Sequence, residues 1–244
     1  MRVFSFLLFL LATCSCTGSY TQNKPESTLT WDQEAQSNIR LRPKYGLVEK
    51  TESQKEADKE FVEATLNGGQ FKGNKRAASD HMIKLGFVYL NRGDLKTAMY
   101  RFNQAYLLDP DNPEQYWGYA AVYMSLEKYE EARLQYQAGL ELQPDNTHLL
   151  TDLGTYYIVM HINNRATNPA KAIVSLDTAI TIFNRSYELD KHDPNTSFKL
   201  SAAYFSNGDC KNALKYLDIC DQSGGDPVTD DYRAALAAIC SPKK

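Results

Sequence analysis

The sequence predicts an all-α array of antiparallel helix pairs, and three observations support this fold class. Small and apolar residues recur with a period of 34 residues from Met82 onward. Pro110 and Pro144 fall at the ends of successive periods, where they would break the chain between units. After the last period, Tyr232, Leu236 and Ile239 at helical spacing indicate one further amphipathic helix. Because a fixed period overrides local propensities, it decides the fold class.

The repeated unit has a fixed internal spacing. The residues that define it in the first two units are Met82, Leu85, Gly86, Tyr89, Ala98, Phe102 and Pro110, then Tyr116, Tyr119, Ala120, Tyr123, Ala132, Tyr136 and Pro144. This pattern resembles the tetratricopeptide repeat (TPR), in which each helix pair is too small to bury its own apolar face. The resemblance implies a solenoid of four units over residues 79–226.

The third unit departs from the period. It opens with Leu153 and Gly154, but Ala179 follows its equivalent Ala132 by 47 residues instead of 34. We therefore predict an insertion at about 161–173. Asn168-Pro169 within it is a good helix start, so the third pair is expected to be longer than the others and to project beyond the array.

The segments on either side of the repeats are predicted separately. Residues 51–78 are expected to form a helix that is half a repeat, followed by a linker, because Thr51-x-x-Gln54 is a capping box. Residues 227–244 are expected to be a capping helix and tail, which protects the last apolar face of a solenoid from water. Residues 16–50 are polar with isolated aromatic residues, and they are predicted to be a flexible tether.

Residues 1–15 are predicted to be a lipoprotein signal peptide. Their apolar run has the length of a signal-peptide core and is too short to cross a bilayer. It ends at Cys14 and Cys16, both in settings that resemble the bacterial lipobox. Ser15 is the small residue wanted before the cleaved bond and favours Cys16 as the lipid anchor, whereas Leu11 keeps Cys14 as the alternative. Plain secretion with neither thiol acylated is a third interpretation.

The other cysteines, Cys210, Cys220 and Cys240, all lie near the end of the chain. Their spacing indicates no zinc site. In a hairpin of two helices that turns near residues 224–227, Cys210 faces Cys240, which predicts a disulfide between them. Cys220 occupies a repeat position for small packed residues and is expected to be a buried, inert thiol. The alternative is that all three thiols stay reduced.

Composition and motifs exclude several classes of function. With 27 Lys and Arg against 30 Asp and Glu, and a pI near 5.8, the chain has no basic excess to neutralise phosphates. Nucleic-acid binding is therefore not expected. The four histidines are scattered, and no nucleophile, phosphate-loop or dinucleotide motif occurs. We predict no catalytic residue, no cofactor and no metal site.

A second stripe on the first helix of each unit is the candidate binding surface. In TPR proteins this stripe lines the concave face where partner segments bind, and its large side chains around small ones suit an apolar helix or extended peptide. The family's clamp for a terminal carboxylate does not match these positions. We leave open whether the stripe forms an open groove or is covered by neighbouring helices or by the tether. Its residues are Ile83, Phe87, Leu90, Trp117, Ala121, Met124, Thr151, Thr155, Ile158, Phe198, Ala202 and Phe205.

Together these features resemble the TPR lipoproteins of Gram-negative cell envelopes. The resemblance implies a membrane-tethered scaffold or adaptor that binds envelope proteins, and it places the chain at the outer membrane, facing the periplasm. One alternative is a pilotin-like or outer-membrane assembly factor that would bind a secretin tail. Another is a lipoprotein that captures a glycan or peptide through Trp117, although the stripe offers few polar partners for a sugar.

Overall fold

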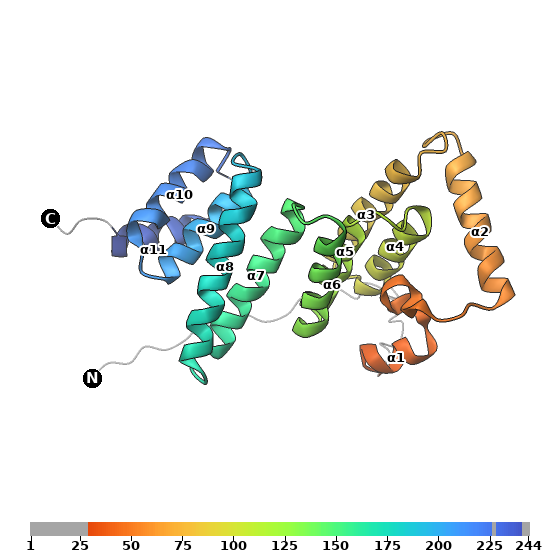
Figure 1. The fold of residues 1–244 in the computed structure, drawn as a ribbon, viewed down its shortest axis with the longest axis horizontal. Coiled ribbons are helices and arrows are strands. Elements are labelled where there is room, and N and C mark those ends of the chain that lie inside the picture. Colours follow the sequence, from red (N-terminus) through yellow and green to blue (C-terminus); the bar gives the residue numbers. More distant parts are fainter. Residues whose placement is uncertain (1–28, 226–227, 241–244) are drawn as a thin grey trace, which may run out of the picture.

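The computed structural model describes residues 29–225 and 228–240. Within these residues the regular secondary structure is entirely helical, as the sequence predicts. Figure 1 shows the helices following one another along an elongated array, with the N-terminal helices at one end and the C-terminal helices at the other. The all-α TPR solenoid is therefore confirmed.

Four antiparallel helix pairs form the array and one helix closes it. The pairs are α3 (Lys75–Asn91) with α4 (Leu95–Leu108), α5 (Glu114–Ser125) with α6 (Tyr129–Leu142), α7 (Thr147–Asn164) with α8 (Pro169–Leu189), and α9 (Pro194–Ser206) with α10 (Cys210–Gln222), followed by α11 (Asp230–Cys240). Most of these helices begin at a side chain that accepts a hydrogen bond from a first-turn N–H group, which satisfies a donor that the helix itself leaves unpaired. These caps are Asn74, Asp94, Asn146, Asn168, Asp193 and Asp209.

Aromatic rings packed on glycines hold the pairs together. Phe102 of α4 is fully buried, and a Cβ atom added at Gly86 of α3 or Gly118 of α5 would lie 2.3 Å from its ring. The same contact recurs in the third pair, where a Cβ atom at Gly154 would lie 2.5 Å from the ring of Phe183. Because no side chain larger than hydrogen fits at these glycines without a shift, the rings fix the distance between neighbouring helices.

The insertion in the third unit is mostly helical. Helix α7 continues to Asn164, past the expected start of the insertion at 161, and α8 begins at Pro169, so residues 165–168 connect the two helices. His161 is buried, and its Nδ1 lies 2.9 Å from the carbonyl oxygen of Ala172. With 18 and 21 residues, α7 and α8 are the longest helices of the array.

The C-terminal hairpin is covalently closed. A disulfide joins Cys210, at the start of α10, to Cys240, at the end of α11, with Cα atoms 5.2 Å apart. Closing a loop of this length contributes about 3 kcal/mol by restricting the unfolded chain. Cys220 is fully buried on α10, and its Sγ donates to the carbonyl of Pro194 at 3.2 Å. The bridge holds α11 over the last helix pair.

Residues 29–50 are folded, so the prediction of a flexible tether is wrong for this part of the chain. It contains α1 (Trp31–Ser37) and the short 3-10 helices η1 (Ile39–Leu41) and η2 (Pro43–Leu47), which lie against α4. Leu41 is fully buried and Tyr45 nearly so. We call residues 29–50 the N-terminal segment. The rest of the predicted tether, together with Cys14 and Cys16, lies outside the described residues.

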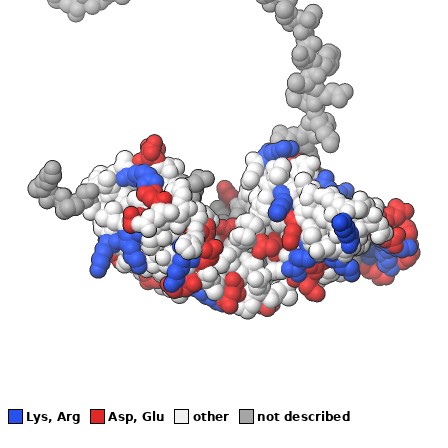
Figure 2. All heavy atoms as spheres, turned by 90° about the horizontal axis from the view of Figure 1, so that it is seen from above, with Lys and Arg blue, Asp and Glu red and all other residues white. Residues whose placement is uncertain are grey.

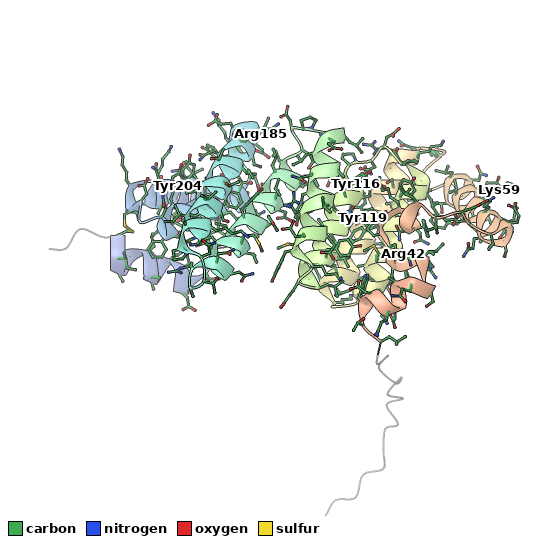
Figure 3. All side chains as sticks on the ribbon, turned by 60° about the horizontal axis from the view of Figure 1, so that its bottom comes forward. Arg42, Lys59, Tyr116, Tyr119, Arg185 and Tyr204 are labelled. Atoms are coloured by element: carbon green, nitrogen blue, oxygen red, sulfur yellow. A yellow bond between two sulfur atoms is a disulfide. The ribbon has the colours of Figure 1, made fainter. Side chains whose placement is uncertain are left out.

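Buried polar contacts hold the N-terminal segment in place. The side-chain amide of Asn103, on α4, donates to the carbonyls of Arg40 at 2.8 Å and Arg42 at 2.9 Å. The Tyr119 hydroxyl donates to Asn103 Oδ1 at 2.9 Å and accepts the Lys44 backbone N–H at 3.2 Å. Figure 3 places Arg42 beside the tyrosines of α5. Asn103 and Tyr119 are fully buried, so losing these bonds would leave unsatisfied polar groups.

Helix α2 (Glu52–Asn67) stands at the N-terminal end of the array (Figure 1). Thr51 and Gln54 form its capping box. None of its side chains is fully buried, and it encloses a cavity of about 260 Å³ with the N-terminal segment and α4. The ion pair between Lys50 and Asp58 links the N-terminal segment to α2. This helix is the half-repeat, and it packs less tightly than the complete pairs.

Replacing Asn103 with alanine tests how the N-terminal segment is held. Asn103→Ala leaves the Arg40 and Arg42 carbonyls without their donor, at a cost of about 1–3 kcal/mol. Hydrogen exchange measured by mass spectrometry should become faster in residues 38–47, while α7–α10 keep their protection. The matched control is Lys96→Ala, which removes a partly exposed ion pair with Glu34 and should leave exchange in residues 38–47 nearly unchanged. Unchanged protection of residues 38–47 in Asn103→Ala would contradict this account.

Candidate functional site

The predicted stripe lies on α3, α5, α7 and α9, the first helices of the four pairs. Ile83 and Thr151 are buried, and the other members are half-buried. Three cavities follow these helices, and no residue of the N-terminal segment lines them. The described part of the predicted tether therefore lines none of these cavities. We call the surface that carries the three cavities the concave groove.

Trp117 of α5 is at the centre of the concave groove. Its ring lies 4.1 Å from the Phe87 ring of α3 and 4.6 Å from the His148 ring of α7, measured between centroids. The Trp117 and His148 rings are stacked, with 17° between their planes. Three neighbouring units therefore contribute one ring each to a continuous aromatic row.

An ion pair fixes the orientation of Trp117. The indole Nε1 donates to Asp152 Oδ2 at 2.6 Å, and the other oxygen of Asp152 lies 2.8 Å from Lys199 Nζ on α9. A charged acceptor makes a stronger hydrogen bond than a neutral one. Since the Asp152 carboxylate is itself held from the next unit, the indole has a defined position before any partner arrives.

Glu114 holds the other end of the aromatic row. Its Oε2 lies 3.0 Å from His148 Nδ1, and its Oε1 accepts from Asn146 at 2.6 Å. The hydrogen bond to Glu114 raises the pKa of His148 above its usual value, against the effect of burial. Burial would raise the pKa of Glu114, but the hydrogen bonds from His148 and Asn146 outweigh it and lower that pKa. Both shifts favour the charged pair.

Two of the cavities lie on either side of the row. The first, of about 560 Å³, is lined by the apolar side chains of Ile83, Phe87, Val88 and Trp117, with polar groups at its edge. The second, of about 500 Å³, lies toward the turn between α8 and α9. It is lined by Trp117, Thr147, His148, Thr151, Asp152, Asp190, His192, Asp193, Pro194 and Asn195. Both volumes are in the range of ordinary ligand sites.

The remaining members of the stripe are less closely associated with the row. Thr155, Ile158, Phe198 and Ala202 line a third cavity of only about 110 Å³. The rings of Phe198 and Phe205 pack on Tyr232 of α11, at 5.2 and 6.0 Å. At its fourth unit the concave groove therefore contacts the capping helix. Leu90, Ala121 and Met124 line none of the three cavities.

The polar residues of the site were not singled out from the sequence. Glu114 and His148 are 34 residues apart, and so occupy the same position in successive units. Lys199 follows Asp152 by 47 residues, the same spacing as between Ala132 and Ala179 across the insertion, so these two residues are equivalent as well. Aligning the units column by column and searching for opposite charges in one column would have found both pairs. Asp190 and Asp193 lie in the turn between α8 and α9, where Asp193 takes the repeat position of Asn146; that pattern indicates a helix cap and not a cavity.

Two further properties bear on the class of site. In the described ranges no group of three or more His, Cys, Asp or Glu side chains is placed to hold a metal ion. Over the same ranges, none of the helices combines the length and apolar character needed to cross a membrane.

Comparisons with known proteins agree with the fold. The tetratricopeptide repeat family matches residues 89–153. Superkiller complex protein 3 of Mus musculus is 34% identical over 76 residues, and that of Homo sapiens 36% identical over the same length. These matches cover 31% of this chain and 5% of each relative, so the chain corresponds to a small part of their length.

Solved structures show the same architecture. The thermophilic TPR protein TTC0263 of Thermus thermophilus superposes with a TM-score of 0.56 at 17% identity, covering 66% of this chain and 80% of that one. The human IFIT1 dimer with PPP-AAAA gives a TM-score of 0.50 at 14% identity, covering 81% and 52%. The chain therefore contains the tetratricopeptide repeat and has the fold of TPR proteins. This fold supports a scaffold for protein–protein interactions.

The stack of Trp117 on His148 provides a pH-dependent signal. The folded-state pKa of His148 is raised. Its pairing with Glu114 therefore stabilises the fold fully at pH values below the unfolded-state pKa of about 6.5, and this stabilisation is lost as the pH rises through the folded-state pKa. Protonated imidazole quenches the fluorescence of a stacked indole. Trp117 fluorescence should therefore increase as the pH rises and His148 loses its proton, with a midpoint above pH 6.5. The titration is measured in a Trp31→Phe background, since the chain has two tryptophans.

The matched variant is Glu114→Gln, which removes the charge opposite His148 and should move the midpoint down toward 6.5. A midpoint that does not respond to Glu114→Gln would show that the pair does not control this histidine.

Proposed function

We propose that the chain is a membrane-tethered scaffold of the bacterial cell envelope, and that it binds a segment of a partner protein in the concave groove. One observation carries the proposal: the row formed by Phe87, Trp117 and His148, which has a cavity on either side. Aromatic residues at the centre of a surface dominate many protein interfaces. The contact of Trp117 with Asp152 orients the indole in advance, which lowers the entropy lost on binding.

Sequence and structure support the envelope location in different ways. The apolar N-terminus ending at Cys14 and Cys16 favours a lipid anchor, with Cys16 preferred. The bridge between Cys210 and Cys240 suits an oxidising compartment such as the periplasm. We therefore propose attachment to the outer membrane, with the concave groove facing the periplasm. A pilotin-like or assembly role is a special case in which the partner is a secretin tail or an assembly component.

The glycan-binding alternative has less support. Polar groups do surround the row, which sugar recognition requires. However, the rings of Phe87 and His148 approach Trp117 from the helices on either side of α5. A sugar would have to displace one of them to stack on the indole. A peptide needs no free ring face, because its side chains enter the cavities beside the row.

Variants of the concave groove should reduce partner capture without unfolding the protein. After cross-linking in intact envelopes and purification, Trp117→Ala and Phe87→Glu should recover about tenfold less of any specific partner, because both remove part of the row. Trp31→Ala, outside the groove, is the matched control and should retain capture. Melting temperatures show whether each variant is folded.

Gly154→Leu is the contrasting variant. Because its side chain meets the Phe183 ring, it should lower the melting temperature markedly. If Trp117→Ala unfolds the protein to the same extent as Gly154→Leu, Trp117 is a core residue and the groove proposal fails. Full partner capture by a folded Trp117→Ala protein would refute it as well.

Metabolic labelling with a fatty-acid analogue tests the anchor. Cys16→Ser should abolish the label and leave an uncleaved or soluble precursor, because the acylated thiol is missing. Cys14→Ser should keep both the label and normal processing. The reverse pattern would move the anchor to Cys14. Absence of label in the wild-type protein would instead indicate plain secretion.

A further inference from the structure

The two cavities beside the aromatic row differ in charge. The cavity toward α3 has a mainly apolar lining, with Asp80, Lys84 and Glu114 at its edge. The cavity toward α9 is lined by three aspartates and two histidines, and by no lysine or arginine. In the view from above, Asp and Glu side chains gather around the hollow midway along the molecule (Figure 2). One side of the row is therefore hydrophobic and the other is acidic.

Two of the three aspartates form no ion pair with Lys or Arg in the described residues, although Asp193 acts electrostatically on His148, which already pairs with Glu114. Asp152 is neutralised by Lys199. Asp190 accepts the backbone N–H of His192, and Asp193 accepts those of Asn195 and Thr196. These donors are uncharged, and in the part of the chain that the structure describes neither carboxylate forms an ion pair with Lys or Arg. The turn between α8 and α9 therefore presents two negative charges to the second cavity.

The two cavities share Trp117 and His148 in their linings, so both border the stacked pair of rings. A bound segment that fills the first cavity with one side chain brings its neighbouring side chains to the second. An acidic neighbour would be repelled by Asp190 and Asp193, and a neutral one would leave their charges unbalanced. A basic neighbour would be attracted by both carboxylates.

We propose that the partner segment carries a bulky apolar side chain for the first cavity and a Lys or Arg close to it for the second. The basic group meets the carboxylates of Asp190 and Asp193. This inference rests on the proposed function, since it concerns the same concave groove, and it goes further by specifying the chemistry of the partner. The carboxylates select among segments by charge, and the first cavity supplies most of the buried area.

Selection from a displayed library of random twelve-residue peptides tests the inference. The target is the full mature chain in detergent, and each enriched peptide is tested again on Trp117→Ala. We expect the peptides that need Trp117 to combine a bulky apolar residue with Lys or Arg within about four positions. Enriched peptides that need Trp117 but show no preference for Lys or Arg would overturn the inference and leave the proposed function standing. If no enriched peptide needs Trp117, both fail.

The contribution of the two carboxylates is measured on the most enriched peptide by fluorescence anisotropy. The double variant Asp190→Asn with Asp193→Asn should bind about fivefold more weakly, as expected for two partly exposed ion pairs. Asparagine is as good a helix cap as aspartate, so Asp193→Asn should keep the start of α9 intact. The matched control is Asp177→Asn, at an exposed residue of α8 that lines neither of the two cavities.

High salt should narrow the difference between the wild type and the double variant, because it screens exposed charges. Equal affinity of the wild type and the folded double variant at low salt would overturn the inference. The same holds if Asp177→Asn weakens binding as much as the double variant does.

Discussion

The packing of an aromatic ring against glycine is the contact on which the rest of this structure depends. Phe102 is fully buried between α3 and α5, at Gly86 and Gly118. Burying such a ring contributes about 2–3 kcal/mol. The ring matters more for the geometry than this energy suggests, because it fixes how closely the two helices approach and how successive pairs are offset. Gly154 and Phe183 repeat the contact in the third pair.

The site follows from this offset. Because successive first helices are displaced by one unit, side chains at equivalent positions come within reach of one another. Glu114 therefore meets His148, its equivalent in the next unit, and the indole of Trp117 meets Asp152, one position beyond its own equivalent. Each contact joins neighbouring units, so the concave groove is rigid only while the array is intact. A protein of this kind holds its binding surface in shape through the repeat itself, with no separate domain for the purpose.

The N-terminal segment shows a different kind of dependence. Residues 44–47 have positive φ values of 53°, 57°, 69° and 53°. This is a left-handed backbone conformation that residues other than glycine rarely adopt. The buried contacts with Asn103 and Tyr119 stabilise it. The N-terminal segment is therefore held against α4, and it lines none of the three cavities of the concave groove.

The sequence alone determined the helix pairs, the place of the insertion and the opposition of Cys210 and Cys240. These features depend on local periodicity and on the register within a single hairpin. Only the tertiary structure decided that residues 29–50 fold, because their stability comes from Asn103 and Tyr119, far along the chain. It also decided that Asp190 and Asp193 face a cavity beside Trp117. The repeat places a capping residue at Asp193, as it does at Asn146, but it does not fix which distant side chains this turn faces, and that geometry appears only when the array is assembled.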